Sequence, residues 1–362
     1  SRASVGLMTI QLATTIRNTT NGYLRNQFYA FDNLGAGLIY GAKGNLEKLK
    51  NPTSKMLKDE ANESVRKSIS YLKTSKDSFL NKDLIFNITS AETLALFKAL
   101  QDPAFGQSEK ISKLIRGMGD IADITGQEKG LLGATRFLNK LNTYSDNMFK
   151  RAYFARELNK SLGSNPIKVG DITVDSIDAA FKTGNLKSIP DQYYADAMEE
   201  AFEGTYQTGS FHAGRKGVFN TLARGFIELG QTPIGATFIP FPKYLVNQFR
   251  FIYEHTPVLG LVNAGGILNK PGKEFDLIKL DPEQFGKTMT GLVGLTTFMS
   301  LRANYGDENT KWYEYKNPLN PSETFDARAA LGPFSMYAWT ADALYKLNPF
   351  GWHSNDKVAK GV

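Results

Sequence analysis

Uncharged segments of equal length recur along the chain. Residues 3–16, 229–242, 256–269 and 288–301 each comprise fourteen residues without a charged side chain. As α-helices they would extend about 21 Å, at about 1.5 Å per residue, which is shorter than the roughly 30 Å hydrocarbon layer of a bilayer. One interpretation is that they are ordinary buried helices of a large helical bundle. The other is that several short, glycine-bearing helices pack together in a channel wall.

Other segments have the periodicity of amphipathic helices. In 131–162 apolar residues recur every three to four positions, and 191–207 has acidic residues on one side and aromatic residues on the other. A last helix is predicted over 336–347. Strand-like stretches separated by Asn, Pro and Ser predict a small hairpin within 311–328. The lysine-rich region 43–83 has few apolar positions, so we expect exposed helices and connections there rather than core.

A pair of prolines interrupts the apolar half of the chain. Pro240 and Pro242 flank Phe241, and no helix continues through this point because proline lacks the N–H donor and restricts the residue before it. We therefore predict a structural kink at Pro240, Phe241 and Pro242. The uncharged segments that follow the kink contain the candidate interface or membrane residues, which are Leu259, Leu261, Ile267, Leu292, Val293, Leu295 and Phe298.

These patterns predict an all-α fold, an elongated multi-helix bundle with a small β-hairpin near the C-terminus. Three regions are expected: an N-terminal helical region at 1–163, an acidic helical insert at 164–210, and an apolar helical region at 211–362 that contains the kink and the hairpin. The first boundary follows from the Gly-Ser-Asn-Pro sequence that begins at Gly163.

Charge is distributed unevenly over the 362 residues, whose formal net charge is +7. Between Lys43 and Lys82 there are ten basic and five acidic residues, whereas 164–210 has three basic and eight acidic ones. Such asymmetry can steer association with DNA, anionic lipid or a neighbouring subunit, or it can be solvated surface. Cysteine is absent, which excludes disulfides and thiolate metal sites.

The sequence has no recognisable catalytic motif. The three histidines, His212, His255 and His353, are far apart and have no carboxylate cluster at metal-ligand spacing. The glycines of 35–41 lack the lysine of a phosphate-binding loop and suit a helix packing face instead. Asp326 and Arg328 are explained by an ion pair or a cap. We therefore expect a protein that is not an enzyme, with no catalytic, cofactor-binding or metal site and no cofactor.

Four stretches of the sequence together resemble a known family. The chain opens with SVGLMTIQLATTIRNTTNGYLRNQF, and later contains AFEGTYQTGSF at 201–211, TPIGATFIPFPKYLVNQFRFIYEHTP at 232–257 and FDARAALGPFSMYAWTADAL at 325–344. This pattern resembles a domain of the large polyvalent proteins of tailed bacteriophages, which also occurs in internal virion (ejection) proteins of short-tailed phages. Because the first residue is Ser1, we expect the chain to be a piece of a longer polypeptide or a processed product.

The resemblance implies a function in genome delivery. An internal virion protein of this kind would be stored in the capsid interior and released into the host cell envelope on infection, where copies would multimerise to help form a conduit for DNA. The expected partners are other copies of the chain (a homo-oligomer), other virion core or portal proteins, phage DNA bound without sequence specificity, and the host membrane.

Three alternatives remain open. The chain could be a structural core, scaffold or portal-associated virion protein that does not enter the membrane. It could belong to an envelope-degrading or nucleic-acid enzyme whose active-site residues lie outside this segment. It could also be a DNA-binding core protein, whose affinity would fall steeply with salt.

Overall fold

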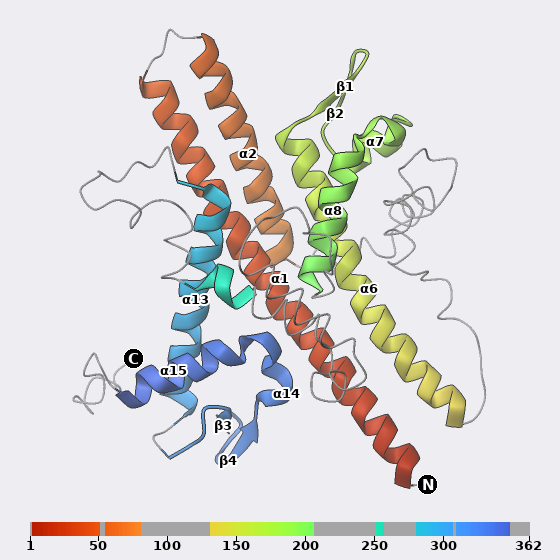
Figure 1. Cartoon of the computed structure of the whole chain (residues 1–362), viewed down its shortest axis with the longest axis vertical. Coiled ribbons are helices and arrows are strands. Elements are labelled where there is room, and N and C mark those ends of the chain that lie inside the picture. The colour runs from red at the N-terminus through yellow and green to blue at the C-terminus, as the bar shows by residue number, and fades with distance from the viewer. Residues whose placement is uncertain are drawn as a thin grey trace, which may run out of the picture.

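The computed structural model describes residues 2–50, 55–80, 131–205, 251–256, 280–306 and 309–347 (Figure 1). Within these ranges the chain is mainly helical, with two antiparallel strand pairs, so the prediction of a mainly α fold is confirmed. The helices are α1 (Arg2–Lys50), α2 (Lys55–Phe79), α6 (Leu131–Ser164), α7 (Ile177–Lys182), α8 (Asp191–Gly204), α13 (Pro282–Tyr305), α14 (Arg328–Leu331) and α15 (Ser335–Leu347), with short 3-10 turns at Leu186–Ser188 and Gly332–Phe334. The strands are β1 (Ile167–Val169), β2 (Ile172–Val174), β3 (Glu314–Asn317) and β4 (Asn320–Asp326).

Helix α1 is the element on which the others pack. It is continuous over 49 residues, so the uncharged segment 3–16 is the first part of a much longer helix. Figure 1 shows α2, α6 and α8 on one side of α1, and α13 and α15 on the other. Helices α2, α6 and α13 all contact α1 directly. The described parts of the acidic segment and of the C-terminal region are therefore joined to the N-terminal helices by packing, through α8 and α13.

Glycines on α1 form the surface that receives α2. A Cβ atom at Gly37 would lie 3.0 Å from the Leu72 side chain, and one at Gly44 would lie 3.0 Å from the backbone oxygen of Ala61. Ser68 of α2 is buried there and its hydroxyl donates to the carbonyl oxygen of Gly37 at 2.7 Å. The interpretation of the glycine stretch as a helix packing face is confirmed. The prediction that 43–83 lies outside the core is wrong for α2, because small polar side chains, and not only apolar ones, are buried against glycines.

Helices α1 and α13 cross at a second pair of glycines. A Cβ atom at Gly35 would lie 2.8 Å from the Cα of Gly286, and one at Gly286 would lie 2.2 Å from the backbone oxygen of Asp32. Glycine at both positions lets the two backbones approach more closely than any side chain would allow. Helix α13 itself begins at Asp281, whose side chain accepts hydrogen bonds from the backbone N–H groups of Glu283 and Gln284. The following proline stands at the first helical position, where its missing donor costs nothing.

One hydrophobic core joins α6, α7, α8 and the first hairpin. Its fully buried members include Leu158, Leu162 and Met198, and it also contains Tyr194, whose hydroxyl donates to the carbonyl oxygen of Leu186 at 2.8 Å. The predicted helix over 131–162 is confirmed as α6, and the predicted helix over 191–207 is confirmed over 191–204 as α8. Strands β1 and β2 are joined by a two-residue turn in which Gly170 has a φ of 60°, a conformation that favours glycine.

A second core lies between α1, α13 and the C-terminal elements. Phe28 of α1 packs against Phe251, Phe334 and Tyr337, with ring centroids 4.8–5.7 Å apart. The predicted hairpin within 311–328 is confirmed as β3 and β4, and the predicted last helix as α15. At the end of β4 the Arg328 guanidinium holds both carboxylate oxygens of Asp326, as the sequence predicted.

Arg302 connects the second core to the hairpin. Its side chain is completely buried, and its guanidinium donates to the carbonyl oxygens of Thr310, Lys311 and Glu314 at 2.7–3.2 Å. One terminal nitrogen lies 2.5 Å from Oδ1 of Asp342 on α15. The planar fork of donors therefore fixes the loop before β3 to α13 and α15 at the same time.

Candidate functional site

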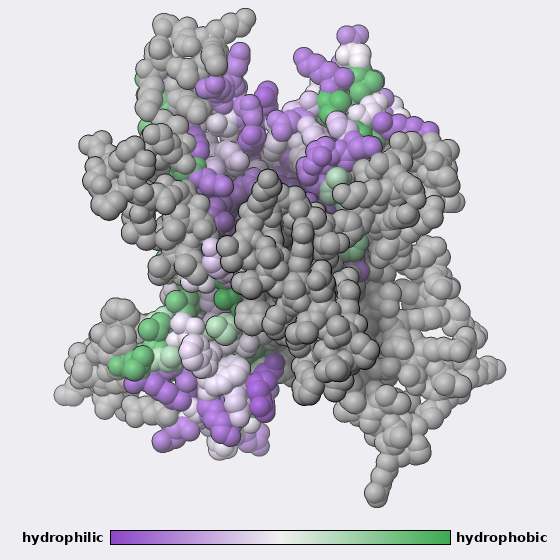
Figure 2. All heavy atoms as spheres, in the orientation of Figure 1, coloured by the Kyte–Doolittle hydropathy of each residue, from purple (hydrophilic) through white to green (hydrophobic). Residues whose placement is uncertain are grey.

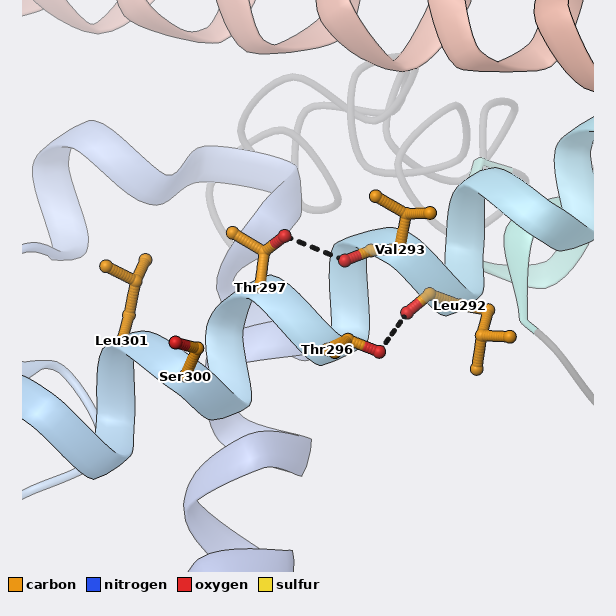
Figure 3. A pocket seen from close by; sticks show the side chains of 6 residues that line it. All are labelled: Leu292, Val293, Thr296, Thr297, Ser300 and Leu301. Carbon is orange, nitrogen blue, oxygen red and sulfur yellow. Dashed lines mark hydrogen bonds between the residues drawn. The ribbon is translucent and has the colours of Figure 1, made fainter. Parts of the chain in front are cut away.

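The outward side of α13 carries an apolar hollow of about 470 Å³. Figure 3 shows six residues of α13 that line it, which are the lining residues within the described part of the chain: Leu292, Val293, Thr296, Thr297, Ser300 and Leu301. Leu292 is 47% exposed and Leu301 is 38% exposed, which is high for large apolar side chains. No charged residue is among the six. We call this surface the α13 face.

The threonines of the α13 face direct their hydroxyl protons to their own helix. The Thr296 hydroxyl donates to the carbonyl oxygen of Leu292, and the Thr297 hydroxyl donates to that of Val293, each at 2.8 Å (Figure 3). Both threonines are exposed, so their hydroxyl oxygens keep the capacity to accept hydrogen bonds. The α13 face is therefore uncharged and mainly apolar, with hydrogen-bond acceptors between its apolar side chains.

The candidate interface residues of this segment divide between two sides of α13. Leu292 and Val293 belong to the α13 face, whereas Phe298 is buried in the second core and Leu295 packs against that core. The remaining candidates, Leu259, Leu261 and Ile267, lie outside the described residues, as does the predicted kink at Pro240, Phe241 and Pro242. Among the helices that the structure describes, none has a stretch both long and apolar enough to cross a bilayer.

A polar cavity of about 440 Å³ lies where α1, α2, α6, α8 and α13 meet. In Figure 2 hydrophilic residues gather over α2 and α8 in the upper part of the view, whereas hydrophobic residues gather lower down over α13 and α15. The lining contains seven carboxylates, three lysines and four tyrosines: Asp32, Glu157, Asp196, Glu199, Glu200, Glu203, Glu283, Lys67, Lys160, Lys287, Tyr29, Tyr40, Tyr71 and Tyr193. Carboxylates therefore outnumber lysines by four.

Lys160 of α6 shows how the cavity holds an ammonium group. Its Nζ lies 2.6 Å from Oε2 of Glu157, 4.6 Å from the ring centroid of Tyr71 and 5.7 Å from that of Tyr29. Burial alone would lower the pKa of Lys160, but the adjacent Glu157 carboxylate and further anionic neighbours outweigh burial and raise it. The lysine is thus held in its charged form by carboxylate contact and cation–π attraction.

Glu200 of α8 is the least compensated of the cavity carboxylates. Within the described part of the chain it has no hydrogen bond or ion pair, whereas Glu203 and Glu254 lie within 4.0 and 2.5 Å of the Lys287 ammonium. Burial, and then repulsion by Glu203 and Glu157, raises the pKa of Glu200 to about 8. Glu200 therefore binds a proton at neutral pH and releases it when more positive charge comes near.

At the edge of the cavity, Asp32 is paired with a buried histidine. His255 is 1% exposed; its Nδ1 lies 2.8 Å from the carbonyl oxygen of Phe251, and its Nε2 lies 3.1 Å from Oδ2 of Asp32. Both ring nitrogens face acceptors, so both contacts are hydrogen bonds only in the imidazolium form. Burial alone would raise the pKa of Asp32, but the charge of His255 and its hydrogen bond lower it.

Sequence reasoning noticed the acidic character of 164–210 but missed the cavity. The signal available was the spacing of Asp196, Glu199, Glu200 and Glu203, which places all four near one side of α8. Their counter-charges, Lys160 and Lys287, lie on other helices and cannot be assigned from spacing. In the described ranges no group of three or more histidine or carboxylate side chains is arranged to hold a metal ion.

Comparisons of the chain with models of known protein families, with curated proteins and with solved structures gave no match.

Proposed function

We propose that this chain is an internal virion (ejection) protein of a tailed bacteriophage, whose copies associate to form part of a conduit for genome delivery through the host envelope. The sequence resemblance at 201–211, 232–257 and 325–344 supports the family. The association of copies is inferred from the α13 face. This is an uncharged surface on a helix whose other side packs in the second core.

The physical reason is the free energy of apolar burial. Burying a leucine or valine side chain stabilises an association by about 1.5–3 kcal/mol, and the α13 face contains three such residues. A stable interface buries about 1,200–2,000 Å² in total, which is more than one helix face supplies. Helix α15 packs against α13 and exposes Met336, Trp339 and Leu347, which are further apolar side chains available to an interface.

The proposed occupant of this surface is a second copy of the chain. An uncharged face with folded-back hydroxyls is complementary to an equally uncharged one, and a second α13 face is such a surface. Contact between two identical faces gives a two-fold dimer, whereas a ring requires the α13 face to contact a different surface of its neighbour. The mass of the assembly distinguishes these two arrangements.

Light scattering coupled to size-exclusion chromatography tests the proposal. We expect wild-type protein to be oligomeric and the double variant Leu292→Glu/Thr296→Glu to be monomeric, since two carboxylates would be buried unpaired at the contact. The matched control is Ile69→Glu, which changes a 62% exposed residue of α2 and should leave the oligomer intact. A monomeric wild-type protein, or a double variant with the wild-type mass, would refute the role of the α13 face.

Vesicle leakage tests the conduit. Purified wild-type protein is expected to release dye from vesicles containing anionic lipid, and the double variant is expected to release less. Oligomers that neither release dye nor float with vesicles would favour the alternative, a structural core or portal-associated virion protein that stays outside the membrane.

Binding to phage DNA is tested separately by its salt dependence. With a net charge of +7, non-specific binding should weaken steeply between about 50 and 200 mM salt, because the released counterions drive it. A flat response over this range would remove DNA from the proposed partners.

A further inference from the structure

We propose that the polar cavity binds an alkylammonium group, held by the carboxylates of α8 and the tyrosine rings of the lining. This inference is independent of the proposed function, because the cavity and the α13 face share no lining residue. Four observations support it: the charge of the lining, the way in which the cavity holds its own lysines, an unsatisfied buried hydroxyl, and the size of the cavity.

The lining has more negative than positive charge. Of its three lysines, Lys160 pairs with Glu157 at 2.6 Å, and Lys67 pairs at 2.7 Å with Glu63, which is outside the lining. Glu200 remains without an ion pair in the part of the chain described here. A cation bound beside Glu200 would take the place of the proton that this carboxylate binds at neutral pH.

The cavity already stabilises ammonium groups by the chemistry that the ligand needs. Lys160 lies over the rings of Tyr71 and Tyr29, and Lys67 lies 5.7 Å from the ring centroid of Tyr40. Aromatic faces attract alkylammonium groups, and carboxylate oxygens accept hydrogen bonds from their N–H groups. A further ammonium group could contact the same two kinds of partner, a carboxylate and an aromatic ring, because Glu200 and Tyr193 both lie on α8 and both line the cavity.

A buried hydroxyl in the lining lacks a partner. Ser164, the last residue of α6, is only 5% exposed, and among the described residues its Oγ has no hydrogen-bond partner. An unsatisfied buried polar atom is costly, by about 1–3 kcal/mol, and such atoms are usually satisfied by water or a ligand. The Ser164 oxygen is able to accept a hydrogen bond from one of the three N–H groups of a primary ammonium group.

The size and arrangement of the cavity indicate an organic cation. Its volume of about 440 Å³ falls within the range of about 300–1,000 Å³ typical of small-molecule sites. The carboxylates are distributed over four helices, and the described residues contain no cluster suited to a metal ion. A flexible chain with an amine at each end would contact both Glu200 and the tyrosine rings.

Proton release provides a readout that a non-specific surface contact would not give. Glu200 faces Glu203 on its own helix, Glu157 and Lys160 on α6, and Lys287 on α13, and the balance of these groups with burial raises its pKa to about 8. An ammonium group bound nearby favours the carboxylate form, so binding at pH 7 expels a proton. Affinity should therefore rise as the pH increases through about 8.

Isothermal titration calorimetry with 1,4-diaminobutane tests the proposal. At low salt and pH 8 we expect one molecule to bind per chain, with a heat at pH 7 that changes with the ionisation enthalpy of the buffer. Glu200→Gln should weaken binding at least about tenfold and abolish the proton release, and Ser164→Ala should weaken it several-fold. The matched control is Glu323→Gln on the exposed strand β4, which should bind like wild type.

The source of the amine is distinguished by a second titrant. A short peptide with a single lysine, blocked at both ends, would bind more tightly than the diamine if the site receives a lysine side chain of a partner protein. Tighter binding of the diamine would assign the site to a free amine. Binding of neither titrant at pH 8, or unchanged binding by both Glu200→Gln and Ser164→Ala, would overturn the proposal.

Discussion

The crossing of α1 and α13 gives the sharpest prediction about stability. Replacing Gly286 by alanine would place a Cβ atom 2.2 Å from the backbone oxygen of Asp32 and 3.0 Å from the backbone nitrogen of Ala36. An ordinary contact begins near 3.4 Å, so the two helices must separate by about 1 Å. Neither neighbour is the flexible end of a side chain, and the strain cannot be relieved by a change of rotamer.

The expected magnitude follows from two opposing effects. Alanine has a higher helix propensity than glycine by about 1 kcal/mol, which stabilises the variant. Overpacking between well-packed elements costs about 1–3 kcal/mol, and separation of α1 from α13 also disturbs the Asp32–His255 pair. We expect Gly286→Ala to lower the free energy of unfolding by about 1–2 kcal/mol.

Gly41→Ala is the matched control on α1. A Cβ atom there would lie 3.0 Å from the hydroxyl oxygen of Ser68 and 3.7 Å from its Cβ, so only a small adjustable side chain must give way. Both variants gain the same helix propensity when glycine is replaced by alanine, so this contribution cancels when their free energies of unfolding are compared. Urea unfolding followed by circular dichroism at 222 nm measures the difference. If Gly286→Ala is as stable as Gly41→Ala, the close approach of α1 and α13 is refuted.

Three further predictions concern the two cores and the buried pair. Arg302→Met should destabilise the protein by about 3–5 kcal/mol, because Asp342 then keeps only the partly exposed Lys346 at 3.2 Å and three carbonyl oxygens near the hairpin lose their buried donor, and it should detach the hairpin, as measured by hydrogen exchange in β3. Because the folded-state pKa of Asp32 is lowered, its pairing with His255 stabilises the protein above the ordinary carboxyl pKa of about 4 and is lost as pH falls below it. Asp32→Asn should therefore reduce stability at pH 7 and flatten its decline between pH 5 and 3 in urea unfolding. Leu158→Ala, at a fully buried position, should cost about 2–5 kcal/mol in the same measurement, and a cost below about 1 kcal/mol would contradict its place in the core.

Sequence patterns alone predicted those elements whose structure depends mainly on their own residues. The helix over 131–162 was predicted because apolar residues recur at helical spacing, and the hairpin within 311–328 because strand-forming stretches flank turn residues. The Asp326–Arg328 contact was also predicted, as an ion pair or a cap, since residues two positions apart share one face of an extended chain.

Patterns were insufficient where burial depends on the facing element. Helix α2 was expected to be exposed because it has few apolar residues, yet Ser68 and Thr74 are buried in it. They are buried because α1 presents glycines and because their hydroxyls are satisfied by backbone oxygens of α1 and α2. The uncharged segment 288–301 was likewise predicted to place Leu292 and Phe298 together at an interface or membrane, but only the structure separates Phe298 in the core from Leu292 on the α13 face.

The sequence by itself determined the helical class, the positions of several helices and the second hairpin, because helical and strand periodicity are properties of neighbouring residues. The tertiary structure alone decided which glycines become crossing points and which charges meet in the polar cavity. Lys160, Glu200 and Lys287 lie on three helices that are far apart in the chain, and no local rule relates them. Charges interact through distance in space, so their pairing is fixed only once α6, α8 and α13 have packed around α1.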